Sequence, residues 1–174
     1  RPEDYHLTGE KLNEAASHAW SRLLPVWEVF KAEAERLAPT DDGQAFTLKR
    51  WLLPFWKALE YGQLEPAAPV KVADKGDPLS HVRYGCPIHL VGLRRDLDKR
   101  VETTQGKLPS PHGMVQEMLN RSPEHLWAFV SNGFKLRILR DNIRLTRQAF
   151  VEFDLQAIFD GRLYADFSLL WRLC

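Results

Sequence analysis

The stretch Leu126–Asn142, LWAFVSNGFKLRILRDN, contains two short runs of β-branched and aromatic residues on either side of Asn132-Gly133. Asn-Gly favours the positive φ values of a tight primed turn, so the stretch predicts a β-hairpin. The second run alternates charged and apolar residues over 135–138. Because side chains alternate along a strand, we expect its apolar pair to face the core and its two cations to face the other side.

Positive charge is concentrated in and after this hairpin. From Arg121 to Arg147 six basic residues stand against two acids, a local balance of +4, although the formal charge of the whole chain is only +1. Such a patch could hold a phosphate backbone without reading its sequence, and salt would then weaken binding steeply. The alternative is a solvated face neutralised by the acids that follow it. The candidate phosphate contacts are Lys135, Arg137, Arg140, Arg144 and Arg147.

A pair of carboxylates follows the basic stretch. Glu152 and Asp154 lie two residues apart on a predicted strand over 150–155, so both project from one face of it. Together they could supply oxygen ligands to Mg²⁺. The alternative, which we favour because surface charge pairs are common, is that this face of an edge strand is simply solvated or pairs with Lys135 and Arg137.

The rest of the chain predicts an α+β or three-layer fold, with N-terminal helices followed by a small mixed sheet. Apolar residues at helical spacing predict helices over 8–37 and 46–61, whose tryptophans we interpret as core. Strands are predicted over 81–84 and 88–93, a short helix over 114–120 and a last helix in YADFSLLWRLC. The run RRDLDKR, Arg94–Arg100, is interpreted as a solvated turn or short helix, and 102–113 as the least structured stretch.

Length and composition indicate one compact domain, divided into a helical part (1–64) and an α/β part (65–174). Two cysteines make no disulfide framework, and no apolar run approaches the twenty or so residues that cross a bilayer. We therefore expect a cytoplasmic protein with no membrane contact. The missing initiator Met and the uninterrupted final helix suggest a piece excised from a longer protein.

The segments HGMVQEMLNRSPEHLWAFVSNGFKLRILRDN and FVEFDLQAIFDGRLYADFSLLWRLC together resemble a known family. They are similar to the amino-terminal region of large class I DNA adenine methyltransferases, the type IIG restriction-modification enzymes and their relatives in phage defence. The resemblance covers 112–174 well and the first hundred residues loosely. In those proteins a SAM-binding glycine motif and an Asn-Pro-Pro-Tyr/Phe motif lie further downstream. The resemblance therefore implies SAM as a cofactor of the parent protein and no methylation by this chain alone.

Many type IIG enzymes resemble PD-(D/E)xK nucleases in this region, where an Asp on one strand and Glu-x-Lys on the next bind Mg²⁺ and activate water. The predicted element order is compatible with that fold. However, His89-Leu90-Val91 stands where Glu-x-Lys would be, and the preceding strand offers His81, Arg83 and Tyr84 but no Asp. The resemblance thus implies a degenerate nuclease-like fold.

The function expected from these observations is a non-catalytic amino-terminal domain of a bacterial DNA methyltransferase or restriction-modification-like defence protein. It would hold double-stranded DNA by its backbone or dock another subunit of the defence system. One alternative is an active Mg²⁺ nuclease, with Glu152 and Asp154, or Asp96 and Asp98, as ligands. A third is a protein-interaction scaffold built on the tryptophan-rich helices.

Overall fold

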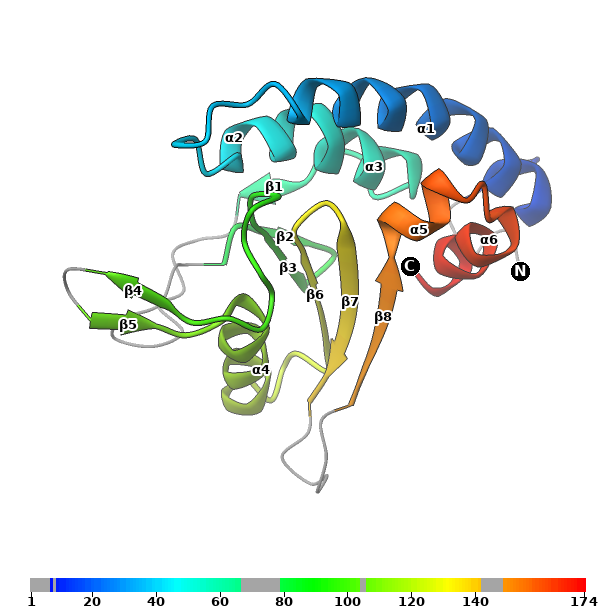
Figure 1. Ribbon diagram of the computed structural model, residues 1–174. Helices are drawn as coiled ribbons and strands as arrows, with labels where there is room; N and C mark the ends of the chain where they lie inside the picture. Colours follow the sequence, from blue (N-terminus) through cyan, green and yellow to red (C-terminus); the bar gives the residue numbers. More distant parts are fainter. Residues whose placement is uncertain (1–6, 8, 67–78, 104–105, 142–148) are drawn as a thin grey trace.

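The computed structural model describes residues 7, 9–66, 79–103, 106–141 and 149–174. Helices lead the chain and a mixed sheet follows, so the coarse α+β prediction is confirmed (Figure 1). One apolar cluster contains residues from both the helical part (1–64) and the α/β part (65–174), such as Trp27 and Phe129.

Six strands form the main sheet, in the order β1-β2-β3-β6-β7-β8. Neighbours run antiparallel except β3 and β6, which are parallel because the chain crosses over between them through helix α4, Pro111–Arg121. A separate hairpin pairs β4 with β5. The strand bounds are β1 Glu65–Pro66, β2 His81–Arg83, β3 Cys86–Leu90, β4 Val101–Thr103, β5 Gly106–Leu108, β6 Trp127–Ser131, β7 Lys135–Arg140 and β8 Phe150–Asp154.

Both faces of the sheet are covered, which makes three layers (Figure 1). On β6 the side chain of Phe129 belongs to the cluster under the N-terminal helices, whereas its neighbours Ala128 and Val130 belong to the cluster under α4. Strand β7 alternates in the same way. The helices are α1 Leu12–Ala34, α2 Gln44–Thr47, η2 Leu48–Leu52, α3 Leu53–Ala58, α4, α5 Leu155–Asp160 and α6 Tyr164–Leu173.

The predicted helix over 46–61 forms as one continuous run with a wide π-helical turn, η2, in its middle. Pro54 explains this turn, because it lacks an N–H and its ring would collide with the carbonyl four residues earlier. The N–H of Leu53 instead reaches the carbonyl oxygen of Leu48. Trp51 and Trp56 on this run are fully buried, so their interpretation as core is confirmed.

The prediction of a tight primed turn at Asn132-Gly133 is wrong in its geometry. Strands β6 and β7 do pair antiparallel, but three residues connect them and only Gly133 among these has a positive φ. A two-residue turn with both φ values positive occurs instead at Tyr84-Gly85, between β2 and β3. The Asn132 side chain forms the turn itself, as its contacts show below.

The stretch 102–113 is more structured than predicted. It contains most of the β4–β5 hairpin and the start of α4. The start signal for α4 is Ser110-Pro111, where the Ser110 hydroxyl accepts the N–H of Gly113 at 3.1 Å and proline occupies the first turn.

Candidate functional site

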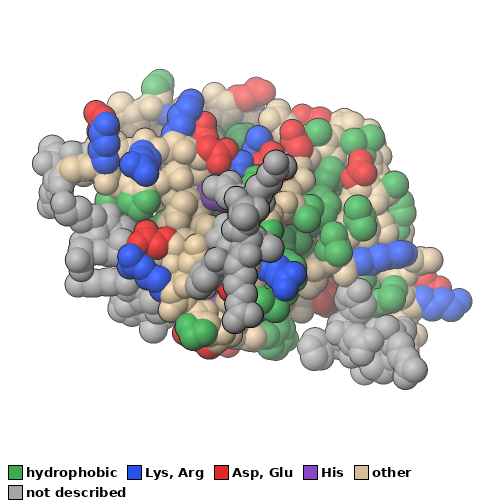
Figure 2. Space-filling view, turned by 90° about the horizontal axis from the view of Figure 1, so that it is seen from below, with side chains coloured by type: hydrophobic (Ala, Val, Ile, Leu, Met, Phe, Trp, Pro, Cys, Tyr) green, Lys and Arg blue, Asp and Glu red, His purple; other side chains and the backbone are tan. Residues whose placement is uncertain are grey.

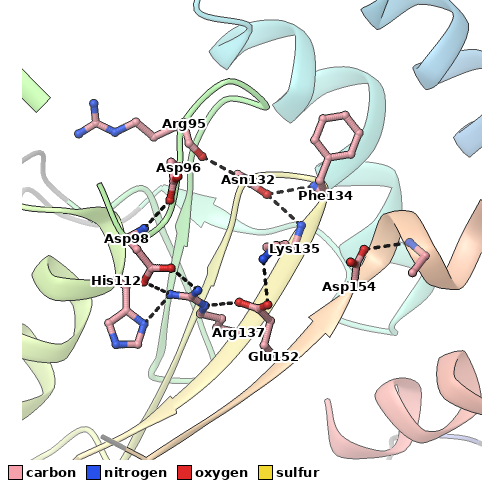
Figure 3. Close-up of polar contacts among 11 residues, drawn as sticks. Arg95, Asp96, Asp98, His112, Asn132, Phe134, Lys135, Arg137, Glu152 and Asp154 are labelled. Carbon is pink, nitrogen blue, oxygen red and sulfur yellow. Dashed lines mark hydrogen bonds and ion pairs between the residues drawn. The ribbon is translucent and has the colours of Figure 1, made fainter. Parts of the chain in front are cut away.

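The turn between β6 and β7 is hydrogen-bonded to the start of β7, to the loop after β3 and to the helical run that contains Trp51. The side-chain oxygen of Asn132 accepts the N–H groups of Phe134 at 3.1 Å and Lys135 at 2.9 Å, and its amide donates to the carbonyl of Arg95 at 2.9 Å (Figure 3). The indole N–H of Trp51 donates to the carbonyl of Gly133 at 2.8 Å. These bonds fix the start of β7 against the helical layer and against the loop that follows β3.

Arg137 is the buried centre of an ion-pair network whose other charged members are partly exposed (Figure 3). Its side chain is only 5% exposed, and two of its nitrogens hold the carboxylate of Asp98 at 2.6 and 2.7 Å. Its Nε donates to Glu152 at 2.6 Å, and Lys135 reaches the other oxygen of Glu152 at 3.0 Å. The guanidinium also lies 4.9 Å from the ring of Phe150. A bidentate bond and a second carboxylate satisfy most of this guanidinium inside the protein.

His112, near the start of α4, completes the network. Its Nδ1 lies 3.1 Å from a terminal nitrogen of Arg137. A guanidinium can only donate, so Nδ1 accepts and the imidazole is neutral with its proton on Nε2. Burial lowers the pKa of His112, and the positive charge of Arg137 lowers it further. The imidazole therefore serves as a hydrogen-bond acceptor at neutral pH.

The network also shifts the pKa values of its two acids and of Arg137. The hydrogen bonds from Arg137 lower the pKa of Asp98, and the bond to Asp98 raises the pKa of Arg137. Burial alone would raise the pKa of Glu152, but its bonds to Arg137 and Lys135 outweigh burial and leave the pKa lowered. Both carboxylates thus stay ionised well below neutral pH.

The predicted phosphate contacts that the structure describes, Lys135, Arg137 and Arg140, are not brought together as one patch. Arg137 is inside, and the Lys135 ammonium, 45% exposed, is paired with Glu152. Arg140 projects from the opposite face of β7, where its guanidinium lies 5.5 Å from the ring of Trp127. Lys and Arg side chains are also dispersed among other types on the face that Figure 2 shows. Arg144 and Arg147 lie outside the described residues.

The candidate magnesium ligands do not fit a metal site. Glu152 is occupied by two cations, and Asp154 caps helix α5 by accepting the N–H of Ala157 at 2.9 Å. Of the alternative pair, Asp98 holds Arg137, and Asp96 accepts the N–H of Asp98 at 2.9 Å. Within the described part of the chain, no three His, Cys, Asp or Glu side chains converge as a metal site would require.

The loop after β3 carries cations to which the sequence analysis assigned no role. Together with the turn before α2 it lines an open cleft of about 440 Å³, which we call the basic cleft. Four cations and two carboxylates line it, a formal balance of +2. The signal in the sequence was the run RRDLDKR, whose cations outnumber its acids by two. The lining residues are Asp42, Gln44, Val91, Gly92, Arg94, Arg95, Asp96, Lys99, Arg100 and Val101.

A second opening, of about 370 Å³, lies on the face of the sheet that carries Trp127. Trp127, Val151 and Leu173 are each about half exposed around it. We call this opening the apolar groove; the other residues that line it are Tyr61, Cys86, Phe129 and Ile138.

A scan against protein-family models finds no match to the chain, and searches of curated proteins and of solved structures find no significant match either. Among the described residues, every helix is too short or too polar to cross a membrane.

Proposed function

We propose that the chain is a non-catalytic DNA-binding domain on a nuclease-like scaffold, and that it belongs to the amino-terminal part of a DNA methyltransferase or restriction-modification-like defence protein. The observation that carries the proposal is an order of elements compatible with the nuclease-like fold that the resemblance implies, with other residues at the expected metal-binding positions. Strand β2, strand β3, helix α4 and the β6–β7 pair come in the order that the sequence resemblance implies, with the β4–β5 hairpin inserted between β3 and α4.

The burial of the residues at the position expected for Glu-x-Lys supports the proposal that the domain is not catalytic. On β3 and just after it, His89 is 4% exposed and Val91 is 7% exposed, and Val91 belongs to the apolar cluster that contains the side chains of helix α4. A carboxylate at either position would be buried against apolar side chains, where an ionised group is costly unless it is paired. The acids of the network offer no replacement, because Arg137 and the cap of α5 already use them.

Electrostatic binding to a DNA backbone needs exposed cations, and the domain carries several of them. Lys135 and Arg140 remain exposed in part, and the basic cleft adds a positive balance in the loop that follows β3. Contacts of this kind position a protein on DNA and carry no sequence information. The domain would then supply affinity, and sequence reading would belong to another part of the parent protein.

One experiment tests binding and catalysis together. The chain is titrated into a fluorescent DNA duplex at low and physiological salt, and is incubated in parallel with supercoiled plasmid in Mg²⁺ or EDTA. We expect binding that weakens steeply with salt and no nicking in either buffer. Cleavage that requires Mg²⁺ and disappears in Glu152→Gln would contradict the proposal in favour of an active nuclease.

Subunit docking is a second candidate, favoured by the apolar groove. Exposed apolar surface of this kind often marks a protein interface. Sedimentation of the chain at rising concentration distinguishes the two functions: self-association that Trp127→Ser abolishes, without any DNA binding, would favour docking.

A further inference from the structure

We propose that the basic cleft, rather than strand β7, receives phosphates of duplex DNA, and that Arg95 and Arg100 are its principal contacts. This inference rests on the proposed function and assigns it a site. The cleft lies where the loop after the carboxyl end of β3 meets the turn before α2. Helix α2 and the β4–β5 hairpin lie on the same side of the molecule (Figure 1).

The first step of the argument is charge compensation. On β7 the positive charges are already neutralised, because Arg137 and Lys135 share Glu152 and Arg137 also holds Asp98. In the basic cleft, Arg95 and Arg100 have no carboxylate within ion-pair distance among the described residues. An uncompensated guanidinium gives up no internal partner when it binds a phosphate, so its contribution is larger.

The two acids that line the cleft bind groups other than Arg95 and Arg100. Asp42 accepts the N–H of Gln44 at 2.8 Å, at the start of α2. Asp96 accepts the N–H of Asp98 at 2.9 Å and pairs with Lys99 at 3.4 Å. These carboxylates order the two segments that line the cleft, and neither neutralises the two arginines.

The second step is the anchoring of the loop 94–100. Asp98 is held by Arg137, Leu97 is buried under α4, and the carbonyl of Arg95 accepts the amide of Asn132. At the start of the loop, the Arg94 guanidinium holds the end of the chain after α1 through the carbonyl oxygens of Leu37, Ala38, Pro39 and Asp41 at 2.7–3.1 Å. A loop held this firmly presents its cations with little loss of backbone entropy on binding.

The two segments that line the cleft also pack closely against each other at Gly92. A Cβ atom on Gly92 would lie 2.6 Å from the carbonyl oxygen of Asp42 and 2.8 Å from the amide nitrogen of Gln44. Only glycine allows this approach of the two backbones. The loop after β3 and the turn before α2 are therefore set at a fixed spacing. Figure 3 shows the Arg95 side chain extending away from the network that holds the loop.

The third step identifies the ligand as a nucleic-acid backbone and not a free nucleotide. No aromatic side chain lines the cleft among the described residues, and its apolar lining is limited to two valines and a glycine. Nucleotide pockets generally enclose the base with apolar or aromatic groups. An open, cationic cleft without such groups suits a phosphodiester that passes across it.

The test compares the affinity of three double variants of the whole chain for one fluorescent DNA duplex across a range of salt. The cleft variant is Arg95→Gln with Arg100→Gln, and the strand variant is Lys135→Gln with Arg140→Gln. The control is Lys11→Gln with Lys57→Gln, which removes the same charge from two exposed positions away from the cleft, one just before α1 and one on α3. Circular dichroism and urea unfolding verify that each variant folds.

For the cleft variant we expect a Kd raised on the order of tenfold and a salt slope reduced by about 2, since each lost phosphate contact lowers that slope by about 1. The control should stay within about twofold of wild type. A cleft variant that binds like wild type, while the strand variant loses binding, would overturn the cleft and leave the proposed function standing. A wild-type chain that fails to bind the duplex at low salt would overturn both. Tighter binding of an RNA duplex of the same sequence would assign the cleft to RNA and overturn the inference.

Discussion

Arg137 provides the sharpest test of the network, because its role as a buried, internally paired cation makes its removal costly. Arg137→Ala deletes the bidentate bond to Asp98, the bond to Glu152 and the donor to His112. Removing one partner of a buried ion pair typically costs about 3–5 kcal/mol. The cost here should be lower, about 2–4 kcal/mol, because the carboxylate that Asp98 presents is mostly open to water and Glu152 keeps Lys135.

Urea unfolding measures this cost directly. With a denaturant dependence of about 2 kcal/mol per molar, the midpoint should fall by about 1–2 M. Arg137→Lys keeps the charge but not the bidentate geometry, so we expect about half the loss. The matched control is Arg140→Ala on the same strand, whose guanidinium contacts an exposed tryptophan ring and should contribute less than about 1 kcal/mol. If Arg137→Ala costs no more than Arg140→Ala, the reasoning about a buried, obligatory cation is refuted.

Three further outcomes follow from local geometry. Gly133→Ala should lower the free energy of unfolding by about 2 kcal/mol or more, because φ is +88° and the new Cβ would lie 2.7 Å from a methyl group of Thr47. Gly85→Ala is the control in the same urea assay: φ is +73° but no atom lies near the new Cβ, so it should cost only about 1 kcal/mol. Ser110→Ala should cost about 1 kcal/mol by removing the cap of α4, and Ser110→Asp should retain it. The folded protein lowers the pKa of His112 below its ordinary value of 6.5, so the unfolded chain binds more protons and the free energy of unfolding should fall as the pH drops through 6.5. In His112→Gln this part of the pH dependence should be absent. An unchanged profile in that variant would count against a buried neutral imidazole.

Local patterns in the sequence predict much of the fold. The spacing of apolar residues predicts α1 and the helical run that contains Trp51, and alternation predicts strands β7 and β8. The long segment 102–113 was misjudged because glycine and proline there mark a hairpin and a helix start as well as a loop. The turn between β6 and β7 was misjudged because the Asn132 side chain completes it through hydrogen bonds that backbone preferences do not contain.

The candidate site depends on distances in space that local patterns do not encode. The pairing of Glu152 with Lys135 and Arg137 was foreseen as an alternative, because β7 and β8 are close along the chain. The second partner of Arg137, Asp98, is 39 residues away and comes from a loop. The burial of Arg137 on strand β7 follows from α4 covering a face that the sequence analysis treated as solvated. The basic cleft likewise needs the turn before α2 to meet the loop after β3.

The central claim, that the domain holds a DNA backbone by charge, is tested most directly by the salt dependence of duplex affinity. For two to four phosphate contacts, the logarithm of the association constant should fall linearly with the logarithm of salt concentration, with a slope between about −2 and −4. The slope should not change when the sequence of the duplex is scrambled, because backbone contacts do not read bases. An affinity that does not depend on salt, or no binding even at low salt, would contradict the account.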